Sequence, residues 1–259
     1  MKEILDLSLF HTKKMYNRSR GNMKMKKILL LLLLLFFPVL FTGTVYSNGD
    51  GNQVIYYIPH QDDEVLTFGV SIYSYLQQGY DVHVVLLTDG SNSGIRKQLG
   101  MTKEAFVTAR NQEFDKALAV LGVKSENITK RAYTDGQLTE EQVEAVIKEY
   151  NKKYPMAIHK TFSYYDPHPD HAAAGNALRN LVQQEILTDA AYYIGPNYTP
   201  TNVDILKDSY DSSYYPFIKA ASQSYNVENE IIGMYGIGWK SVPKQFEFLE
   251  SDPMSRYHE

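Results

Sequence analysis

Histidine and aspartate residues gather in two short segments whose composition suits the binding of a metal ion. Residues 59–64 read Pro-His-Gln-Asp-Asp-Glu, and residues 165–171 read Tyr-Asp-Pro-His-Pro-Asp-His. A catalytic zinc site needs about three protein ligands and an open position for water. The chain has no Cys, so such a site must be built from His, Asp and Glu. The two segments are therefore candidates for metal-assisted hydrolysis.

Five side chains of these segments are assigned expected roles. We predict that His60 and Asp63 supply two metal ligands from one tight turn and that His171 supplies the third. Neighbouring side chains in a turn point in different directions, so Asp62 can face the attacking water as general base. His168 lies one helical turn before His171, and we expect it to help the developing oxyanion or the leaving amine.

Each motif also has a purely structural interpretation. An acidic run such as residues 62–64 can cap a helix and interact with its dipole, and a His-x-x-His pair alone is weak evidence. Together the motifs favour a site, because three of the seven His fall into just two segments. His83 and His159 lie inside predicted strands, where we expect core or sheet-face roles.

Strand and helix patterns alternate along the chain. The predicted strands cover residues 54–59, 81–88, 128–133, 157–164 and 190–194. The predicted helices cover residues 65–78, 102–121, 139–153, 170–187 and 214–225. This alternation predicts an α/β fold with a mostly parallel sheet and helices on both faces. Ligands of such folds bind at the carboxyl ends of the strands, where both segments lie.

Capping residues mark the ends of the predicted helices. Thr102 is the expected N-cap of one long helix, and Gly122 is its stop. Thr139 and Gln142 form a capping pair at the start of the next. Residues 195–213 read as a long surface loop, and no clear pattern emerges after residue 226.

The N-terminus has the features of an export signal. Residues 23–27 are basic, residues 28–41 are almost all Leu and Phe, and small residues follow. The apolar stretch is shorter than the roughly 20 residues of a spanning helix, but an uncleaved anchor stays the alternative. We expect residues 1–47 to be a signal peptide or membrane anchor and residues 48–259 to be the functional domain, secreted or otherwise extracytoplasmic.

The charge of the expected domain limits its partners. Residues 48–259 hold 18 Lys and Arg against 28 Asp and Glu, a net charge of −10. This argues against nucleic acid and strongly anionic polymers. We expect a small-molecule or glycan substrate, with any membrane or cell-wall association through the N-terminus. The sequence indicates no oligomeric state.

The two segments resemble the signatures of the PIG-L/LmbE-like deacetylases. Residues 60–64 (His-Gln-Asp-Asp-Glu) resemble the family's His-Pro-Asp-Asp-Glu, and residues 168–171 (His-Pro-Asp-His) are similar to its second signature. Residues 110–123 resemble its Arg-x-x-Glu helix, and residues 88–90 resemble the exit of its second strand. The resemblance covers about residues 54–180.

The resemblance implies a Rossmann-like α/β fold and zinc-dependent removal of acetyl groups from N-acetylglucosamine-containing molecules. It implies Zn²⁺ ligand roles for His60, Asp63 and His171, the base role for Asp62, and oxyanion or acid help from His168.

Three further residues follow from the resemblance. Asp170 is similar to the family's carboxylate behind the metal ligands. Arg110 is expected to form a structural or rim ion pair with Glu113, with direct substrate contact as the alternative.

The first motif and the segment before the second motif also depart from the family pattern. Gln61 replaces the usual Pro, which should alter the turn without touching a ligand. Asp166 stands where some members place an aromatic residue, and Tyr164 or Tyr165 is a candidate for that role.

The sequence thus predicts a zinc-dependent hydrolase that removes an N-acetyl group from an N-acetylglucosamine-type sugar or glycoconjugate outside the cytoplasm. Two alternatives stay open. One is another metallohydrolase that cleaves an ester or phosphoester. The other is a catalytically silent, cell-surface sugar-binding protein, which should have lost Asp62 or a ligand.

Overall fold

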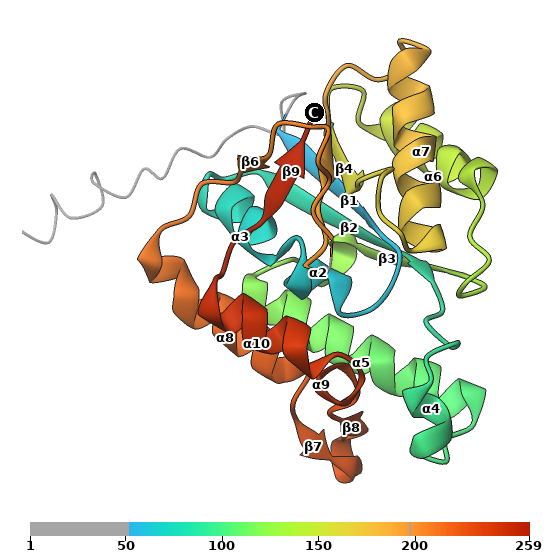
Figure 1. Ribbon diagram of the computed structural model, residues 1–259, viewed down its shortest axis with the longest axis vertical. Coiled ribbons are helices and arrows are strands. Elements are labelled where there is room, and N and C mark those ends of the chain that lie inside the picture. Colours follow the sequence, from blue (N-terminus) through green and yellow to red (C-terminus); the bar gives the residue numbers. More distant parts are fainter. Residues whose placement is uncertain (1–51, 197) are drawn as a thin grey trace, which may run out of the picture. The chain divides into compact units, whose positions relative to one another are not determined.

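The computed structural model describes residues 52–196 and 198–259, which form an α/β fold around one central sheet (Figure 1). The sheet of this part of the chain has seven strands in the order β3-β2-β1-β4-β5-β9-β6. The strands are β1 Gln53–Ile58, β2 Asp81–Thr88, β3 Ile128–Tyr133, β4 Ile158–Phe162, β5 Ala190–Tyr193, β6 Leu206–Lys207 and β9 Arg256–His258. Strands β1 to β5 pair in parallel, and β9 is antiparallel to β5 and β6. The predicted Rossmann-like, mostly parallel sheet is confirmed.

Helices cover both faces of this sheet. They are α2 Asp63–Leu66, α3 Gly69–Gln77, α4 Ile95–Gln98, α5 Lys103–Leu121, α6 Glu140–Lys153, α7 Pro169–Gln183, α8 Tyr215–Ser224, α9 Ile237–Ser241 and α10 Pro243–Ser251. Helices α6 and α7 pack on one face, and α3, α5, α8 and α10 pack on the other.

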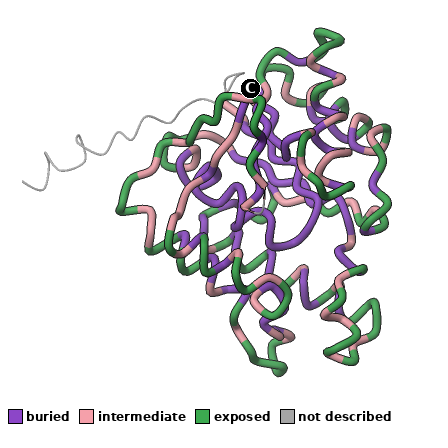
Figure 2. The backbone as a smooth tube through the Cα atoms, viewed as in Figure 1, coloured by how far each residue is buried: buried purple, intermediate pink, exposed green. Residues whose placement is uncertain are grey.

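Successive side chains of β1 point to opposite faces of the sheet and pack in two different hydrophobic cores. Ile55 and Tyr57 join the core under α6 and α7, whereas Tyr56 and Ile58 join the core under the other helices. All four are fully buried, as expected of a parallel strand covered on both sides. Figure 2 shows the buried backbone at the centre of the molecule.

The order of the strands creates a crevice at the carboxyl ends of β1 and β4. The chain runs outward from β1 through β2 to β3 and then returns to β4 on the other side of β1. Neighbouring strands whose connections leave in opposite directions form the usual ligand site of an open α/β sheet. Both motifs follow these two strands.

The predicted caps are confirmed. Thr102 Oγ1 accepts the Ala105 N–H at 3.2 Å, and Gly122 ends α5 with φ +96°. Thr139 and Gln142 form the reciprocal capping box of α6. His83 and His159 are buried in β2 and β4, as expected.

The helix predicted over residues 65–78 is wrong in one respect, because it is broken into α2 and α3. In a continuous helix the Ser71 N–H would donate to the Thr67 carbonyl. Here Ser71 N–H donates to Ser255 Oγ at 3.2 Å, and Ser255 Oγ donates to the Thr67 carbonyl at 2.7 Å. A hydroxyl from the far end of the chain therefore takes the place of the helical hydrogen bond.

The C-terminal third adds elements that the sequence pattern does not predict. The expected loop 195–213 contains β6 and the start of a 3-10 helix, Ser212–Tyr214. A two-stranded ribbon of β7 Glu228–Asn229 and β8 Met234–Tyr235 follows α8.

The expected signal or anchor, residues 1–47, lies outside the described residues. Among the helices of residues 52–196 and 198–259, none combines the length and the apolar character that crossing a membrane requires.

Candidate metal centre

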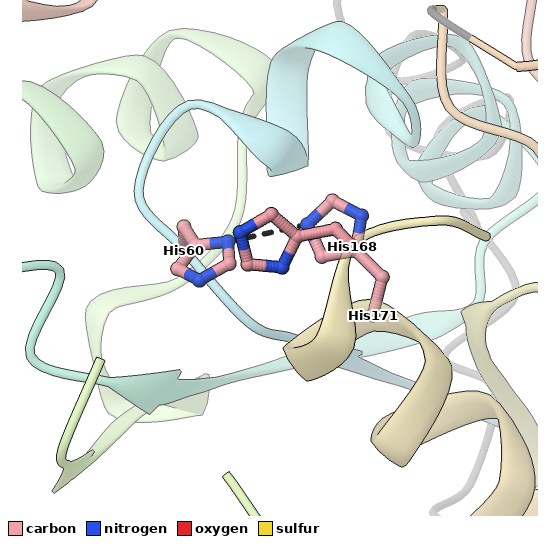
Figure 3. Close-up of side chains that lie close together, drawn as sticks. All are labelled: His60, His168 and His171. Carbon is pink, nitrogen blue, oxygen red and sulfur yellow. Dashed lines mark hydrogen bonds between the residues drawn. The ribbon is translucent and has the colours of Figure 1, made fainter. Parts of the chain in front are cut away.

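The three predicted ligands converge at the carboxyl ends of β1 and β4. His60 follows β1, Asp63 begins α2, and His171 lies in the first turn of α7. Figure 3 shows the side chains of His60 and His171 together with that of His168. His60 Nδ1 is 3.2 Å from Asp63 Oδ2 and 3.2 Å from His171 Nε2. Asp63 Oδ2 is 3.3 Å from His171 Nε2. Three electron-pair donors thus form a nearly equilateral triangle.

The dimensions of this triangle fit a zinc ion. Protein ligands lie about 2.0–2.2 Å from zinc in a tetrahedral arrangement, which puts them roughly 3.3–3.6 Å apart. The observed edges of 3.2, 3.2 and 3.3 Å lie at or about 0.1 Å below the lower end of that interval. The donor set of two imidazoles and one carboxylate is also typical of catalytic zinc.

Two carboxylates lie behind His60 and set its orientation. His60 Nε2 is 3.0 Å from Asp170 Oδ2 and 3.3 Å from Asp135 Oδ1. Asp170 is itself fixed, because its carboxylate accepts the backbone N–H groups of Gly136 and Leu138 at 2.8 and 3.1 Å. A proton on Nε2 satisfies these carboxylates and leaves the Nδ1 lone pair for the triangle. Such outer carboxylates orient metal-binding imidazoles.

His171 is held mainly by packing. Its ring stacks on Phe162, the last residue of β4, with 3.8 Å between ring centroids. Its Nδ1 lies 3.2 Å from Asp166 Oδ1, at an angle too poor for a hydrogen bond. Asp166, which stands where some members of the resembled family place an aromatic residue, therefore contributes charge beside the ligand.

The surroundings of the triangle favour positive charge. Burial opposes protonation of His60, but Asp135, Asp170 and Asp63 raise its pKa well above the usual value. Burial likewise opposes protonation of His171, and Asp63 raises its pKa. A field that favours imidazolium also attracts a metal cation, which competes with protons for the same atoms.

Asp62, the predicted base, is buried beside Arg110. Burial raises the pKa of Asp62 to about 6, and Arg110 opposes this rise. Arg110 Nη2 donates to Asp62 Oδ2 at 3.2 Å. Asp62 also has φ +95° and ψ −31°, a conformation that a residue other than Gly rarely adopts.

The ion pair expected between Arg110 and Glu113 is not present among the described residues, and this prediction is wrong. Arg110 donates to the carbonyl of Gly90 at 2.8 Å, to that of Gln61, and to Asp62. Glu113 accepts the backbone N–H groups at the start of α9. Both side chains are buried. Arg110 therefore bonds the turn that holds His60 and Gly90, just after β2, which pack against it, whereas Glu113 bonds the start of α9.

His168 is the N-cap of α7 and lies at the side of the triangle. Its Nδ1 accepts the Asp170 N–H at 3.2 Å, so the proton of the neutral ring belongs on Nε2. Its ring centroid is 4.7 Å from that of His60 and 4.6 Å from that of His171. Burial and the two neighbouring imidazoles lower its pKa. His168 can therefore donate from Nε2 or join the two other imidazoles as a ligand.

Gln61 points away from the triangle. Its side chain is buried, and its Nε2 donates to Asn111 Oδ1 at 2.9 Å and to the Asp89 carbonyl at 3.3 Å. A Cβ atom on Gly90 would lie only 1.9 Å from Gln61 Oε1. Gln61, which replaces the usual Pro, thus links the turn that holds His60 to helix α5.

The triangle lies in an open cavity of about 710 Å³. Tyr165 is not among its lining residues. Instead it is 40% exposed, with its ring against Tyr164 and His258. Away from the metal ligands the cavity is lined by Asn92, Ser93, Tyr198, Ser241, Val242 and Gln245.

Two residues of the site, Asp135 and Tyr225, were missed in the sequence. Asp135 follows β3 at the same edge of the sheet as the two motifs, so the strand-end rule could have found it. Glu64 and Tyr225 form a buried pair beside Asp62. No local signal marks Tyr225, because the contact joins residues 161 positions apart.

The family comparison covers the region that carries this site. Residues 55–182 match the model of a family described as PIG-L: GlcNAc-PI de-N-acetylase. The resemblance seen in the two motifs is confirmed, and the match includes every predicted ligand. No curated protein sequence matches the chain.

Several solved structures share the fold of this chain. The N,N'-diacetylchitobiose deacetylase from Pyrococcus horikoshii, in complex with an inhibitor, has a TM-score of 0.57 and 18% identity, over 77% of each chain. The zinc-inhibited form of a teicoplanin deacetylase has a TM-score of 0.55 and 15% identity, over 80% of this chain and 97% of its own. The 4-carboxy-2-hydroxymuconate hydratase from Pseudomonas putida has a TM-score of 0.54 and 18% identity, over 80% and 94%.

Proposed function

We propose that this protein is a zinc-dependent hydrolase that removes the N-acetyl group from an N-acetylglucosamine-type sugar or glycoconjugate. The observation that carries the proposal is the triangle of His60, Asp63 and His171 donor atoms, with edges of 3.2 to 3.3 Å, beside a buried carboxylate. The match of residues 55–182 to the PIG-L family model supports the same activity.

The residues around the triangle divide the hydrolysis between them. Zinc held by the three ligands supplies a Lewis acid for the amide carbonyl. Asp62 takes a proton from the attacking water, and its carboxylate is kept in place by Arg110. His168 presents its Nε2 proton to the developing oxyanion or the leaving nitrogen. The amide C–N bond breaks, and acetate and a free amine are released.

The charge of the cavity favours neutral or cationic substrates. Four carboxylates line it, those of Asp62, Asp63, Asp135 and Asp166, and among the described residues one guanidinium does. That guanidinium, on Arg110, already donates to Asp62 and to two backbone carbonyls. A zinc ion would not fully balance these carboxylates. We therefore expect neutral amino sugars to bind better than phosphorylated or carboxylated ones.

The similar structures bear on this choice of reaction. The deacetylases from Pyrococcus horikoshii and of teicoplanin support deacetylation. The hydratase indicates that the fold alone does not fix the reaction. Its named substrate carries carboxylate groups, which the acidic lining would repel here. The silent sugar-binding alternative is disfavoured, because each of the predicted ligands and the base is present in the sequence.

We further propose that the reaction takes place outside the cytoplasm. The support is the basic and then apolar run of residues 23–41, which is typical of an export signal. A cell-surface glycan or an external amino sugar would then be the available substrate. Detection of the protein in the cytoplasmic fraction alone would contradict this part of the proposal.

The activity is tested by acetate release from N-acetylglucosamine oligomers with purified, zinc-loaded protein. We expect one acetate for each new amine, and loss of turnover after treatment with a chelator. Asp62→Asn should lower kcat by at least about 100-fold, because general-base catalysis contributes that much or more. N-acetylglucosamine 1-phosphate and a simple acetate ester serve as comparison substrates. Faster cleavage of the ester or of a phosphoester than of the amide would refute the proposal.

A further inference from the structure

The backbone of Asp62 is strained at the point where the proposed base is attached. Its φ of +95° and ψ of −31° lie outside the regions that side chains other than Gly adopt freely. Such a conformation costs on the order of 1–3 kcal/mol and persists only where surrounding contacts impose it. The contacts that impose it at Asp62 therefore determine where the carboxylate lies.

Two buried side chains hold the Asp62 N–H. This group donates to Tyr225 Oη at 2.8 Å and to Glu64 Oε2 at 3.0 Å. Tyr225 Oη in turn donates to Glu64 Oε1 at 2.6 Å. Both residues are almost fully buried, so neither partner is readily replaced by water. The three groups close a ring of hydrogen bonds around one strained peptide.

Tyr225 is itself held by the segment that begins α9. Gly238 lies so close to its ring that a Cβ atom there would be 2.6 Å from Tyr225 Cδ1. The Trp239 N–H donates to the Tyr225 carbonyl at 3.3 Å. The tyrosine can therefore neither retreat from Asp62 nor rotate away without moving α9.

Helix α9 is anchored to α5 by Glu113. The Glu113 carboxylate accepts the Ile237 N–H at 2.8 Å and the Gly238 N–H at 3.2 Å. Arg110, one turn earlier on α5, donates to Asp62 from the other side. The Arg-x-x-Glu helix thus reaches Asp62 twice, directly through the arginine and indirectly through α9 and Tyr225.

We propose that Tyr225, together with Glu64, is a positioning residue that holds Asp62 in its strained conformation and so aims the general base. The proposal rests on the base role given to Asp62 under the proposed function. It explains why Glu113 turns away from Arg110, and it gives the Gly-Ile-Gly-Trp run at residues 236–239 a role. That role is to hold Tyr225 against the metal turn.

The first test is the Tyr225→Phe variant, which removes the hydroxyl and keeps the ring. We expect kcat for acetate release to fall about 10- to 100-fold, because a displacement of the order of 1 Å has that effect. KM should change by no more than about two-fold, and zinc content should be unchanged. In an Asp62→Asn background the same change should cause little further loss, because the base that it positions is already absent.

The matched control is Tyr57→Phe. Tyr57 is also fully buried, and its hydroxyl bonds His159 Nδ1 at 2.9 Å on the opposite face of the sheet. Its removal should leave kcat unchanged even where stability falls. Equal losses of kcat in the two Tyr→Phe variants would indicate a general effect of lost hydroxyls and overturn the proposal. Glu64→Gln is a second variant at the ring of hydrogen bonds, and it should lower kcat in the same way.

Crystal structures of the wild type and Tyr225→Phe give a readout that needs no activity. We expect the φ of Asp62 to leave the left-handed region in the variant and its carboxylate to move. An unchanged Asp62 in the variant would overturn the positioning role. If the wild type releases no acetate from any acetamido sugar, the proposed function fails, and this structural comparison still decides whether Tyr225 positions Asp62.

Discussion

Helix α7 and its N-cap hold two of the site histidines, and Gly175 of this helix packs closely against the end of β4. A Cβ atom at this position would lie 2.5 Å from the Tyr164 nitrogen and 2.7 Å from the Phe162 carbonyl oxygen. Both atoms belong to the backbone, one at the last residue of β4 and one just after this strand, so neither can turn aside. The Gly175→Ala variant therefore tests how strictly this packing sets the metal centre.

The size of the effect follows from these distances. Non-bonded heavy atoms need about 3.5 Å, so α7 must move away from β4 by roughly an ångström at Gly175. Overpacking of this kind costs about 1–3 kcal/mol. His171 lies one turn earlier on the same helix, and the edges from its Nε2 to His60 and Asp63 should lengthen. A shift of about 1 Å at a catalytic group can cost about 100-fold in rate.

The assay combines urea unfolding in the presence of a chelator, zinc content after dialysis, and acetate release. We expect Gly175→Ala to lose stability, zinc affinity and kcat together. Gly69→Ala in α3 is the control, because its Cβ would meet nothing nearer than 3.7 Å. If Gly175→Ala unfolds at the same urea concentration as the wild type and keeps full zinc and kcat, the packing argument is wrong.

Two further predictions concern Asp170, the carboxylate behind His60, and the buried side chain of Lys160. Asp170→Asn should weaken zinc binding by about 10- to 100-fold, because the amide orients His60 less well; a chelator competition measures this, and unchanged affinity would exclude the role. Burial lowers the pKa of Lys160 to about 8, against the opposing effect of Asp208. A lysine with a depressed pKa destabilises the fold while the unfolded chain is protonated. The free energy of unfolding should thus rise by about 2 kcal/mol between pH 7 and 9.5, relative to Lys160→Met. The prediction is contradicted if urea unfolding shows the same change in the free energy of unfolding between pH 7 and 9.5 for the wild type and Lys160→Met.

The sequence was sufficient for the elements that have strong periodicity or caps. The five parallel strands and helices α5 to α7 were predicted because apolar runs, Thr102, Thr139 and the glycine stop mark them locally. Strands β6 to β9 have only two or three residues each, which is too few for a pattern. The break between α2 and α3 depends on Ser255, and no window of local sequence includes both.

In the candidate site, too, residues with a local sequence signal could be predicted, and residues placed only by tertiary contacts could not. His60, Asp63 and His171 could be brought together from sequence, because strand ends in a parallel sheet share one edge. Arg110 was paired with the wrong partner, because the resemblance to the Arg-x-x-Glu helix suggested Glu113. The buried contact of Tyr225 with Glu64 arises only from tertiary packing.

The contacts of Gln61 limit which amino-acid substitutions this chain can tolerate nearby. Its amide nitrogen bonds Asn111, and its amide oxygen occupies the space that any side chain at position 90 would need. Substituting the family's usual proline for Gln61 alone would leave Asn111 without this donor and open a gap beneath Gly90. Gln61 excludes a larger residue at position 90, and Arg110 Nη1, which would lie 2.8 Å from its Cβ atom, and the φ of +64° oppose such a residue as well. Positions 61, 90 and 111 are therefore expected to be epistatic, so that a tolerated exchange at one depends on which residues stand at the other two.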